Sequence, residues 1–244
     1  MLKALAVLLA LTPVLAAAQD VELELVLMAD ASGSIDAAEI EFQRQGYATA
    51  MQDPAVLSAI ANSAYGRIAV TYVEWASVGT EDVVVPWRII DGPDSAAAFA
   101  AAFDGRPRRA FGRNAIGSAL LTGKRLIETN EYEGWRKVID FSGDSANNWN
   151  GPSIAEARAE VLAAGITING LPILCRACAR PGLSDLESLY AERIIGGPGA
   201  FVITADDMDS LADAIRRKLI LEIGGEMPAR DVADAQPPSI QRVR

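Results

Sequence analysis

The feature that most constrains this chain is a loop, Asp30-Ala31-Ser32-Gly33-Ser34, that directly follows the largely apolar stretch Leu23 to Ala29. Such a stretch predicts a buried parallel strand, and the loop then places three short oxygen side chains at its carboxyl end. Open α/β sheets bind their ligands at this edge. Carboxylate and hydroxyl oxygens favour a hard divalent cation over zinc or copper, whereas ordinary capping of the next helix is the alternative role of the loop.

Along the rest of the chain, apolar runs alternate with amphipathic stretches, which is typical of a mostly parallel sheet covered by helices. We expect strands over residues 21–29, 67–75, 82–90, 135–141, 166–174 and 200–204. We expect helices over residues 36–51, 95–103, 112–128, 152–164, 183–191 and 206–222. Pro86 suggests that the strand 82–90 lies at an edge. The pattern predicts one doubly wound α/β domain over residues 19–223, with helices on both faces of a single sheet.

The two ends of the chain depart from this pattern. Residues 1–18 combine a basic start at Lys3, an apolar core of roughly a dozen residues and a small-residue site at Ala18, which predicts a cleaved signal peptide. That core is shorter than the roughly 20 residues of a membrane span, so we expect export to the periplasm or the cell exterior; an uncleaved anchor is the alternative. Residues 224–244 contain few apolar side chains and predict a disordered tail.

The composition excludes several functional classes. The formal net charge is −10, which argues against nucleic acid or an anionic membrane as the partner. The chain contains no histidine, which excludes Ser-His-Asp and Cys-His catalysis and the usual catalytic zinc sites. We therefore expect a protein that is not an enzyme.

The two cysteines, Cys175 and Cys178, form a Cys-Arg-Ala-Cys motif. In an oxidising compartment we expect them to form a structural disulfide that closes a small loop. A thioredoxin-like redox pair is the alternative, but that motif opens a helix near the start of its fold, and this one follows a late strand.

Two more polar side chains fall at the same predicted edge of the sheet as the first loop. Asn114 lies in the glycine-containing turn Gly112–Gly117 that opens a helix, and Asp144 follows the strand 135–141. Because the carboxyl ends of parallel strands meet at one edge, these loops would converge on one oxygen-lined site. Its members would be Asp30, Ser32, Ser34, Asn114 and Asp144.

This arrangement resembles the metal-ion-dependent adhesion site of the von Willebrand factor type A domain, over nearly the whole stretch from Val21 to about Ile223. The first loop matches the family's Asp-x-Ser-x-Ser motif, and Asp144 matches its strand-ending Asp. The segment Gly112–Leu120 corresponds to the family's Gly-Gly-Thr-x-Ile-Gly-x-Ala-Leu turn. The segments Ser142–Asn148 and Ile194–Phe201 are further similar to DUF1194, a bacterial branch of exported proteins with this type of domain.

The resemblance implies a cation, Mg²⁺ first and Mn²⁺ or Ca²⁺ as alternatives, held by the five positions with one coordination position open. An acidic side chain of an extracytoplasmic protein would fill that position. Asn114 stands where the family has Thr; its amide oxygen can ligate such a cation, or it can cap the helix instead. Asn147, Asn148, Trp149 and the loop 75–79 are candidates for the rim that contacts the partner, with core packing as the alternative for Trp75 and Trp149.

Other functions remain open at this stage. If Asn114 in place of Thr prevents cation binding, the surface around the predicted site would act as a metal-free docking scaffold. A metal-assisted hydrolase would use Asp30 and Asp144, but no general base other than a carboxylate is evident. The basic cluster Arg106, Arg108, Arg109 and Arg113 would steer an acidic partner, or is a solvated charged loop.

Overall fold

The computed structural model describes residues 18–174 and 185–225. Its sheet has the strand order β3-β2-β1-β4-β5, in which β3 is antiparallel to β2 and the other pairs are parallel. The strands are β1 (Gln19–Asp30), β2 (Ile68–Trp75), β3 (Asp82–Ile90), β4 (Tyr132–Gly143) and β5 (Thr167–Pro172). The mostly parallel sheet is confirmed, and Pro86 lies in the edge strand β3, where its missing N–H leaves no central ladder incomplete.

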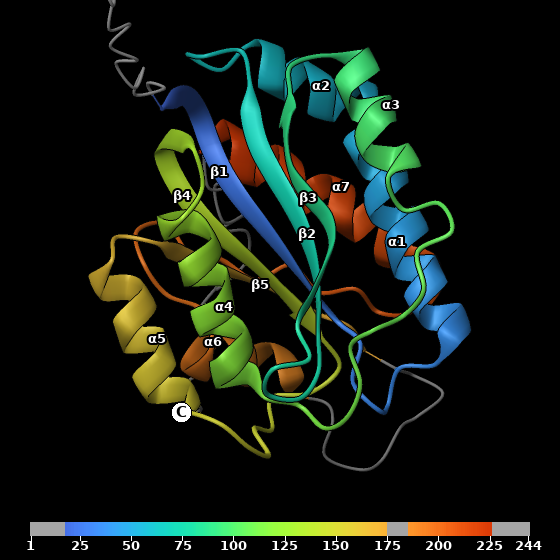
Figure 1. Ribbon diagram of the computed structural model, residues 1–244, viewed down its shortest axis with the longest axis vertical. Helices are drawn as coiled ribbons and strands as arrows, with labels where there is room; N and C mark the ends of the chain where they lie inside the picture. Colours follow the sequence, from blue (N-terminus) through green and yellow to red (C-terminus); the bar gives the residue numbers. More distant parts are fainter. Residues whose placement is uncertain (1–17, 175–184, 226–244) are drawn as a thin grey trace, which may run out of the picture.

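Helices cover both faces of this sheet, as the sequence predicts (Figure 1). The helices are α1 (Ala37–Met51), α2 (Pro54–Ala61), α3 (Pro93–Ala101), α4 (Ile116–Glu128), α5 (Ile154–Ala163), α6 (Leu186–Arg193) and α7 (Met208–Gly224). One face carries α1, α2, α3 and α7, and the other carries α4, α5 and α6. The sequence analysis missed α2, which starts where the Asp53 side chain accepts a hydrogen bond from the Ala55 amide and Pro54 occupies the first turn.

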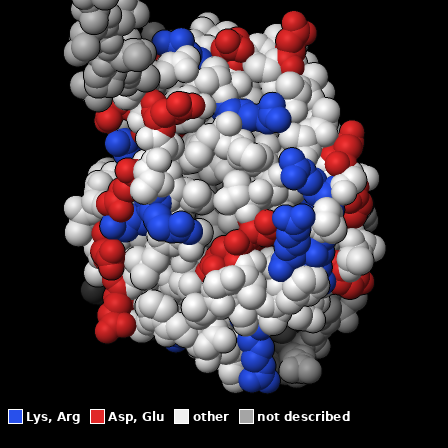
Figure 2. All heavy atoms as spheres, viewed as in Figure 1, with Lys and Arg blue, Asp and Glu red and all other residues white. Residues whose placement is uncertain are grey.

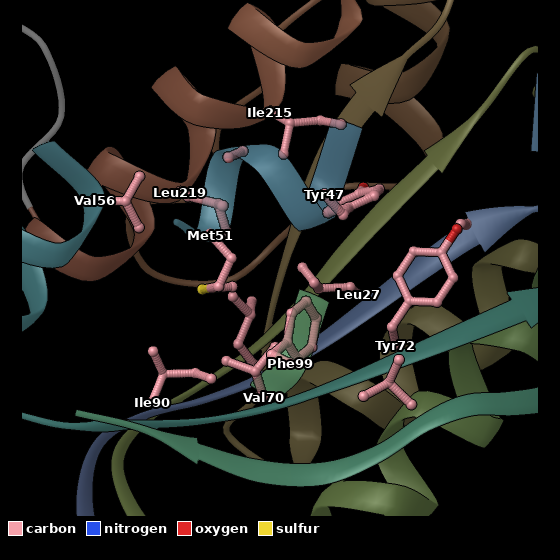
Figure 3. Close-up of a cluster of buried hydrophobic side chains, with 14 of the residues drawn as sticks. Leu27, Tyr47, Met51, Val56, Val70, Tyr72, Ile90, Phe99, Ile215 and Leu219 are labelled. Atoms are coloured by element: carbon pink, nitrogen blue, oxygen red, sulfur yellow. The ribbon is translucent and has the colours of Figure 1, made fainter. Parts of the chain in front are cut away.

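The central strand β1 divides the hydrophobic core into two parts. Leu25 and Leu27 contribute to the cluster under α1, α2, α3 and α7, whereas Val26 and Met28 contribute to the cluster under α4, α5 and α6. Figure 3 shows the first cluster, in which Leu27 of β1 lies near Tyr47 of α1. Ile215 and Leu219 of α7 belong to the same cluster. A strand buried on both faces reads as a nearly continuous apolar run, which is why the sequence identified β1 clearly.

One predicted strand is wrong. The segment 200–204 forms only an isolated bridge to β5, at Val202, and is not a sixth strand; Ala205, which follows it, forms another isolated bridge with Ile173. Around Gly170 the hydrogen bonds follow a parallel ladder, since its amide donates to the Phe201 carbonyl. The next donor in that ladder would be the amide of Pro172, which has no N–H, so the ladder is interrupted there.

The connections around β1 and β4 create a topological switch point at the carboxyl edge of the sheet. These strands are neighbours, but the chain leaves β1 toward α1 on one face and leaves β4 toward α5 on the other. Such a switch point is where open α/β sheets bind ligands. The predicted site loops follow these two strands and precede α4.

Several predictions concern residues outside the described ranges. They are the signal peptide up to residue 17, the disulfide between Cys175 and Cys178, and the tail beyond residue 225. Within residues 18–174 and 185–225, no helix is long and apolar enough to cross a membrane.

Candidate metal centre

The first loop of the candidate centre is ordered by its own backbone. Asp30, the last residue of β1, is fully buried, and its Oδ1 accepts a hydrogen bond of 2.7 Å from the Ser32 amide. The hydroxyl oxygens of Ser32 and Ser34 lie 3.3 Å apart. Asp36 then caps α1 through a capping box with Glu39. Because Asp36 performs the capping, the carboxylate of Asp30 and the two hydroxyls remain available to a ligand.

The second loop, which carries Asn114, is joined directly to the first. The Gly33 amide donates a hydrogen bond of 2.8 Å to the carbonyl of Gly112. Gly112 has a φ of 108°, and a Cβ there would lie 2.4 Å from the Ser77 hydroxyl oxygen, so this close approach requires glycine. The loops of the predicted site therefore meet in the structure as the strand order predicts.

Asn114 is buried next to this junction, with 7% of its surface exposed. Its side chain makes no hydrogen bond within the described part of the chain. The cap of α4 is provided instead by Asn148, whose Oδ1 accepts a hydrogen bond of 3.2 Å from the Gly117 amide. Helix capping, the alternative role for Asn114, is therefore taken by another residue, and the Asn114 amide is free to ligate a cation.

The third loop brings a second carboxylate to the centre. Among the described residues, Asp144 Oδ1 and Asp30 Oδ2 are both buried and have no hydrogen-bond partner. Gly143 leaves room for the Asp30 carboxylate, because a Cβ at this position would lie 2.9 Å from Asp30 Oδ2 and 3.0 Å from the Tyr190 hydroxyl. Buried carboxylate oxygens without partners are costly, so two of them close to neutral oxygen donors favour binding of a cation.

The electrostatics support the same conclusion. Burial, and secondly the repulsion of Asp144, raise the pKa of Asp30 to about 7, although hydrogen bonds from Ser32 oppose the rise. Burial raises the pKa of Tyr190 well above its ordinary value, so its hydroxyl stays protonated and donates to the Gly143 carbonyl at 3.0 Å. A cation between the two carboxylates would stabilise both charged forms.

The donor set fits a hard divalent cation. It comprises two carboxylates, two hydroxyls and one amide oxygen, and it contains no nitrogen or sulfur donor. No cluster of three or more His, Cys, Asp or Glu side chains suited to a metal occurs in the ranges 18–174 and 185–225. A cation here would thus depend on neutral oxygens and retained water for the rest of its coordination shell, as Mg²⁺ commonly does.

Arg108 has a role at this centre that the sequence analysis missed. Its guanidinium donates hydrogen bonds to the carbonyls of Ala31, Ser32 and Ile35, and its Nε donates to the Ala110 carbonyl. The sequence placed it only in a basic cluster that either steers partners or is solvated. Because the carbonyls of Ala31, Ser32 and Ile35 belong to a loop far away in sequence, no local motif reveals these contacts.

The predicted rim residues lie in different environments. Trp149 is 59% exposed, and Asn147 is exposed as well. Both polar atoms of Asn148 already bond to the protein, because its Nδ2 donates to the Pro152 carbonyl at 2.9 Å. Trp75 is fully buried and stacks on Phe141, so it belongs to the core and not to the rim.

Comparisons with known proteins identify the fold. A family model with the description "Protein of unknown function (DUF1194)" matches residues 20–227. One similar structure is proximal thread matrix protein 1 from the mussel byssus, solved with a zinc-occupied metal-ion-dependent adhesion site. It is 16% identical to this chain with a TM-score of 0.57, and the match covers 84% of this chain and 46% of the mussel chain. The von Willebrand factor domain of the pilus tip protein Mfa5 from Porphyromonas gingivalis is 10% identical with a TM-score of 0.55. The match covers 86% of this chain and 98% of the Mfa5 chain.

The pilus adhesin SpaC from Lactobacillus rhamnosus GG is 13% identical with a TM-score of 0.59, covering 85% of this chain and 31% of its own. This chain thus spans about half or less of the mussel protein and of SpaC. No curated protein sequence matches it. At these identities the likeness establishes the fold alone, which is that of the von Willebrand factor type A domain, and the predicted resemblance in fold is confirmed.

Proposed function

This chain belongs to the DUF1194 family, and from that premise we propose that it is an exported, non-enzymatic module that binds a protein partner through a divalent cation. The cation is Mg²⁺, with Mn²⁺ or Ca²⁺ as alternatives. The ligands are Asp30, Ser32, Ser34, Asn114 and Asp144. The partner is an extracytoplasmic protein.

The observation that carries this proposal is the pair of buried carboxylate oxygens, Asp30 Oδ2 and Asp144 Oδ1, which lack a partner among the described residues. They lie in the loops at the switch point of the sheet that also carry the Ser32 and Ser34 hydroxyls, and the loop of the buried Asn114 joins these loops. A structural ion pair would have placed a cationic side chain there, whereas Arg108 bonds to loop carbonyls instead.

The bound cation would supply Lewis acidity toward an incoming carboxylate. Ser32 and Ser34 are neutral donors, so the protein neutralises the cation only in part and leaves it attractive to an anionic ligand. Ser34 is exposed, which leaves one side of the site open to solvent. A partner's Asp or Glu would complete the coordination shell from this side.

The related structures support the same type of function by analogy of fold. Two of them are named as a pilus adhesin and a pilus tip protein, and the mussel protein holds zinc in its adhesion site. None of the three names describes an enzyme. Fold alone does not define function, so the transfer to this chain rests on the site geometry.

Calorimetric titration of the EDTA-treated chain with Mg²⁺, Mn²⁺ and Ca²⁺ tests the cation part of the proposal. We expect saturable binding at one site for the wild type and none for Asp30→Ala. Asp104→Ala, which removes an exposed carboxylate, is the matched control and should bind like the wild type. A folded wild-type chain that binds none of the three cations would leave only the metal-free docking scaffold.

A further inference from the structure

The face around the candidate centre carries large apolar side chains that are exposed. Val78 is 50% exposed, Phe111 55% and Trp149 59%. They come from three separate loops, after β2, before α4 and after β4. Exposed apolar side chains that gather on one face mark interaction sites more often than they mark ordinary surface.

Backbone hydrogen bonds and close contacts hold these loops together beside the candidate ligands. The Trp149 amide donates a hydrogen bond of 2.8 Å to the Asn114 carbonyl, and the Ser77 amide donates to the Phe111 carbonyl at 3.4 Å. A Cβ on Gly151 would lie 2.8 Å from Val78 Cγ2, which brings the loop of Trp149 against the loop of Val78. The exposed side chains are therefore fixed around the cation site and do not belong to independent loops.

Two guanidinium groups stack on these aromatic rings. The Arg113 guanidinium carbon lies 4.5 Å from the centroid of the Trp149 ring, and the Arg108 guanidinium carbon lies 5.3 Å from that of Phe111. Arg108 is committed to loop carbonyls, whereas Arg113 is exposed and forms no ion pair within the described ranges. Stacking leaves the N–H edge of Arg113 available to a carboxylate.

This face carries an exposed arginine although the chain as a whole is acidic. The chain carries a formal net charge of −10, yet the exposed guanidinium of Arg113 lies over the Trp149 ring at this face. Figure 2 shows acidic and basic side chains mixed over the side of the molecule that it views, with one basic side chain at its lower end. An exposed guanidinium without an ion pair among the described residues favours an acidic segment as the partner, and the net charge of −10 disfavours a second copy of the same chain.

We propose that Val78, Phe111, Arg113 and Trp149, here called the rim patch, bind an acidic protein segment that carries apolar or aromatic side chains beside its carboxylates. This inference rests on the proposed function, because the same segment supplies the carboxylate that reaches the cation. Arg113 binds a second carboxylate of the segment, and the apolar side chains pack on Trp149, Phe111 and Val78. Tryptophan and arginine at the centre of such a contact contribute most of the binding free energy.

The stacking on Trp149 orders Arg113 before the partner arrives. A free arginine side chain loses rotamer freedom when it forms an ion pair, and this loss cancels much of the gain at exposed sites. Because Arg113 is already held over the ring, less freedom remains to be lost on binding. The apolar part is needed as well, since exposed charges alone are weakened by salt.

Three labelled polymers test the proposal by fluorescence anisotropy in the presence of Mg²⁺: a random copolymer of glutamate and tyrosine, polyglutamate, and a random copolymer of lysine and tyrosine. We expect the glutamate–tyrosine copolymer to bind most tightly. Trp149→Ala and Arg113→Glu should each weaken that binding by about tenfold or more. Trp135→Ala and Arg125→Glu, at exposed positions outside the rim patch, are the matched controls and should bind like the wild type.

The outcomes separate this inference from the proposed function. Binding that requires the cation but is unchanged in Trp149→Ala and Arg113→Glu overturns the inference and leaves the proposed function standing. Binding that requires the rim patch but persists in EDTA overturns the cation-dependent function and leaves the inference. The inference is also overturned if polyglutamate binds equally well, if the lysine copolymer binds more tightly, or if no polymer binds. Dimerisation of the chain through Trp149 would overturn it as well.

Discussion

The guanidinium of Arg108 donates a hydrogen bond of 3.0 Å to the carbonyl oxygen of Ser32, a candidate cation ligand. The same side chain also bonds to the carbonyls of Ala31 and Ile35. It therefore holds the backbone of the first loop on both sides of the serine. Arg108 acts on the cation only through this backbone, so its role is to position ligands.

We expect Arg108→Ala to weaken cation binding by about 10- to 100-fold, the usual cost of removing a group that orients metal ligands. Loop carbonyls without donors would let the Ser32 hydroxyl move away from the cation. Calorimetric titration measures the change, and Arg109→Ala, at the exposed neighbouring position, is the control. Equal affinities in the two variants would show that Arg108 does not order the loop.

Gly143 provides a second test of how the centre is built. The Cβ of Gly143→Ala would lie within 2.9 Å of Asp30 Oδ2 and 3.1 Å of Trp75 Cζ2, so side chains must shift to accept it. We expect a loss of about 1–3 kcal/mol in the free energy of unfolding, typical of an overpacked core, together with weaker cation binding. Chemical denaturation measures the first effect. Gly92→Ala has open space around its Cβ and should change the free energy of unfolding far less.

Lys218 is the central group of a buried charge cluster between α7 and the sheet. Its Nζ lies 2.8 Å from Asp140 Oδ1 and also pairs with Glu222, and all three side chains are buried. Lys218→Met would leave two buried carboxylates without a cation, and we expect it to lower the free energy of unfolding by about 3–5 kcal/mol. Denaturant titration measures this loss. A variant as stable as the wild type would mean that the cluster does not stabilise the packing of α7 on the sheet.

Glu222 makes stability depend on pH. Burial chiefly, opposed by Lys218, raises its pKa from the ordinary value of 4.5 to about 7. Between these values the folded chain keeps a proton that the unfolded chain releases, so the free energy of unfolding falls as the pH rises from about 4.5 to about 7. We expect Glu222→Gln to remove part of this fall in denaturation curves recorded in EDTA, because Asp30, whose pKa is also raised to about 7, contributes to the same fall. Glu192→Gln, an exposed control, should keep it, and a fall of unchanged size in Glu222→Gln would contradict the assignment.

The sequence predicts the outline of the site because its signals are local. Asp30 and Asp144 each follow an apolar strand, and parallel strands bring their carboxyl ends to one edge. The cap by Asn148 and the contacts of Arg108 join segments that are far apart in the chain, so they follow from packing alone. Trp75 shows the same limit, since its burial depends on Phe141 from another strand.

The segment 200–204 shows how one residue elsewhere can overrule a local pattern. Its apolar composition predicts a strand, but a strand needs a complete partner, and Pro172 in β5 cannot donate the next hydrogen bond. The ends of the other strands differ from the prediction by a few residues, as at β4, which begins at Tyr132 instead of Trp135. Pairing with β1 extends β4 beyond its apolar run.

The central claim is that a divalent cation binds between Asp30 and Asp144, with Asn114 as a ligand. Anomalous diffraction from crystals soaked in MnCl₂, recorded at the manganese absorption edge, tests it most directly. We predict one strong peak within coordination distance, about 2–2.5 Å, of Asp30 or Asp144 or of a water that either holds, and near the Ser32 and Ser34 hydroxyls and the Asn114 amide oxygen. Well-ordered site loops without that peak, or a manganese ion bound only elsewhere on the chain, would contradict the account.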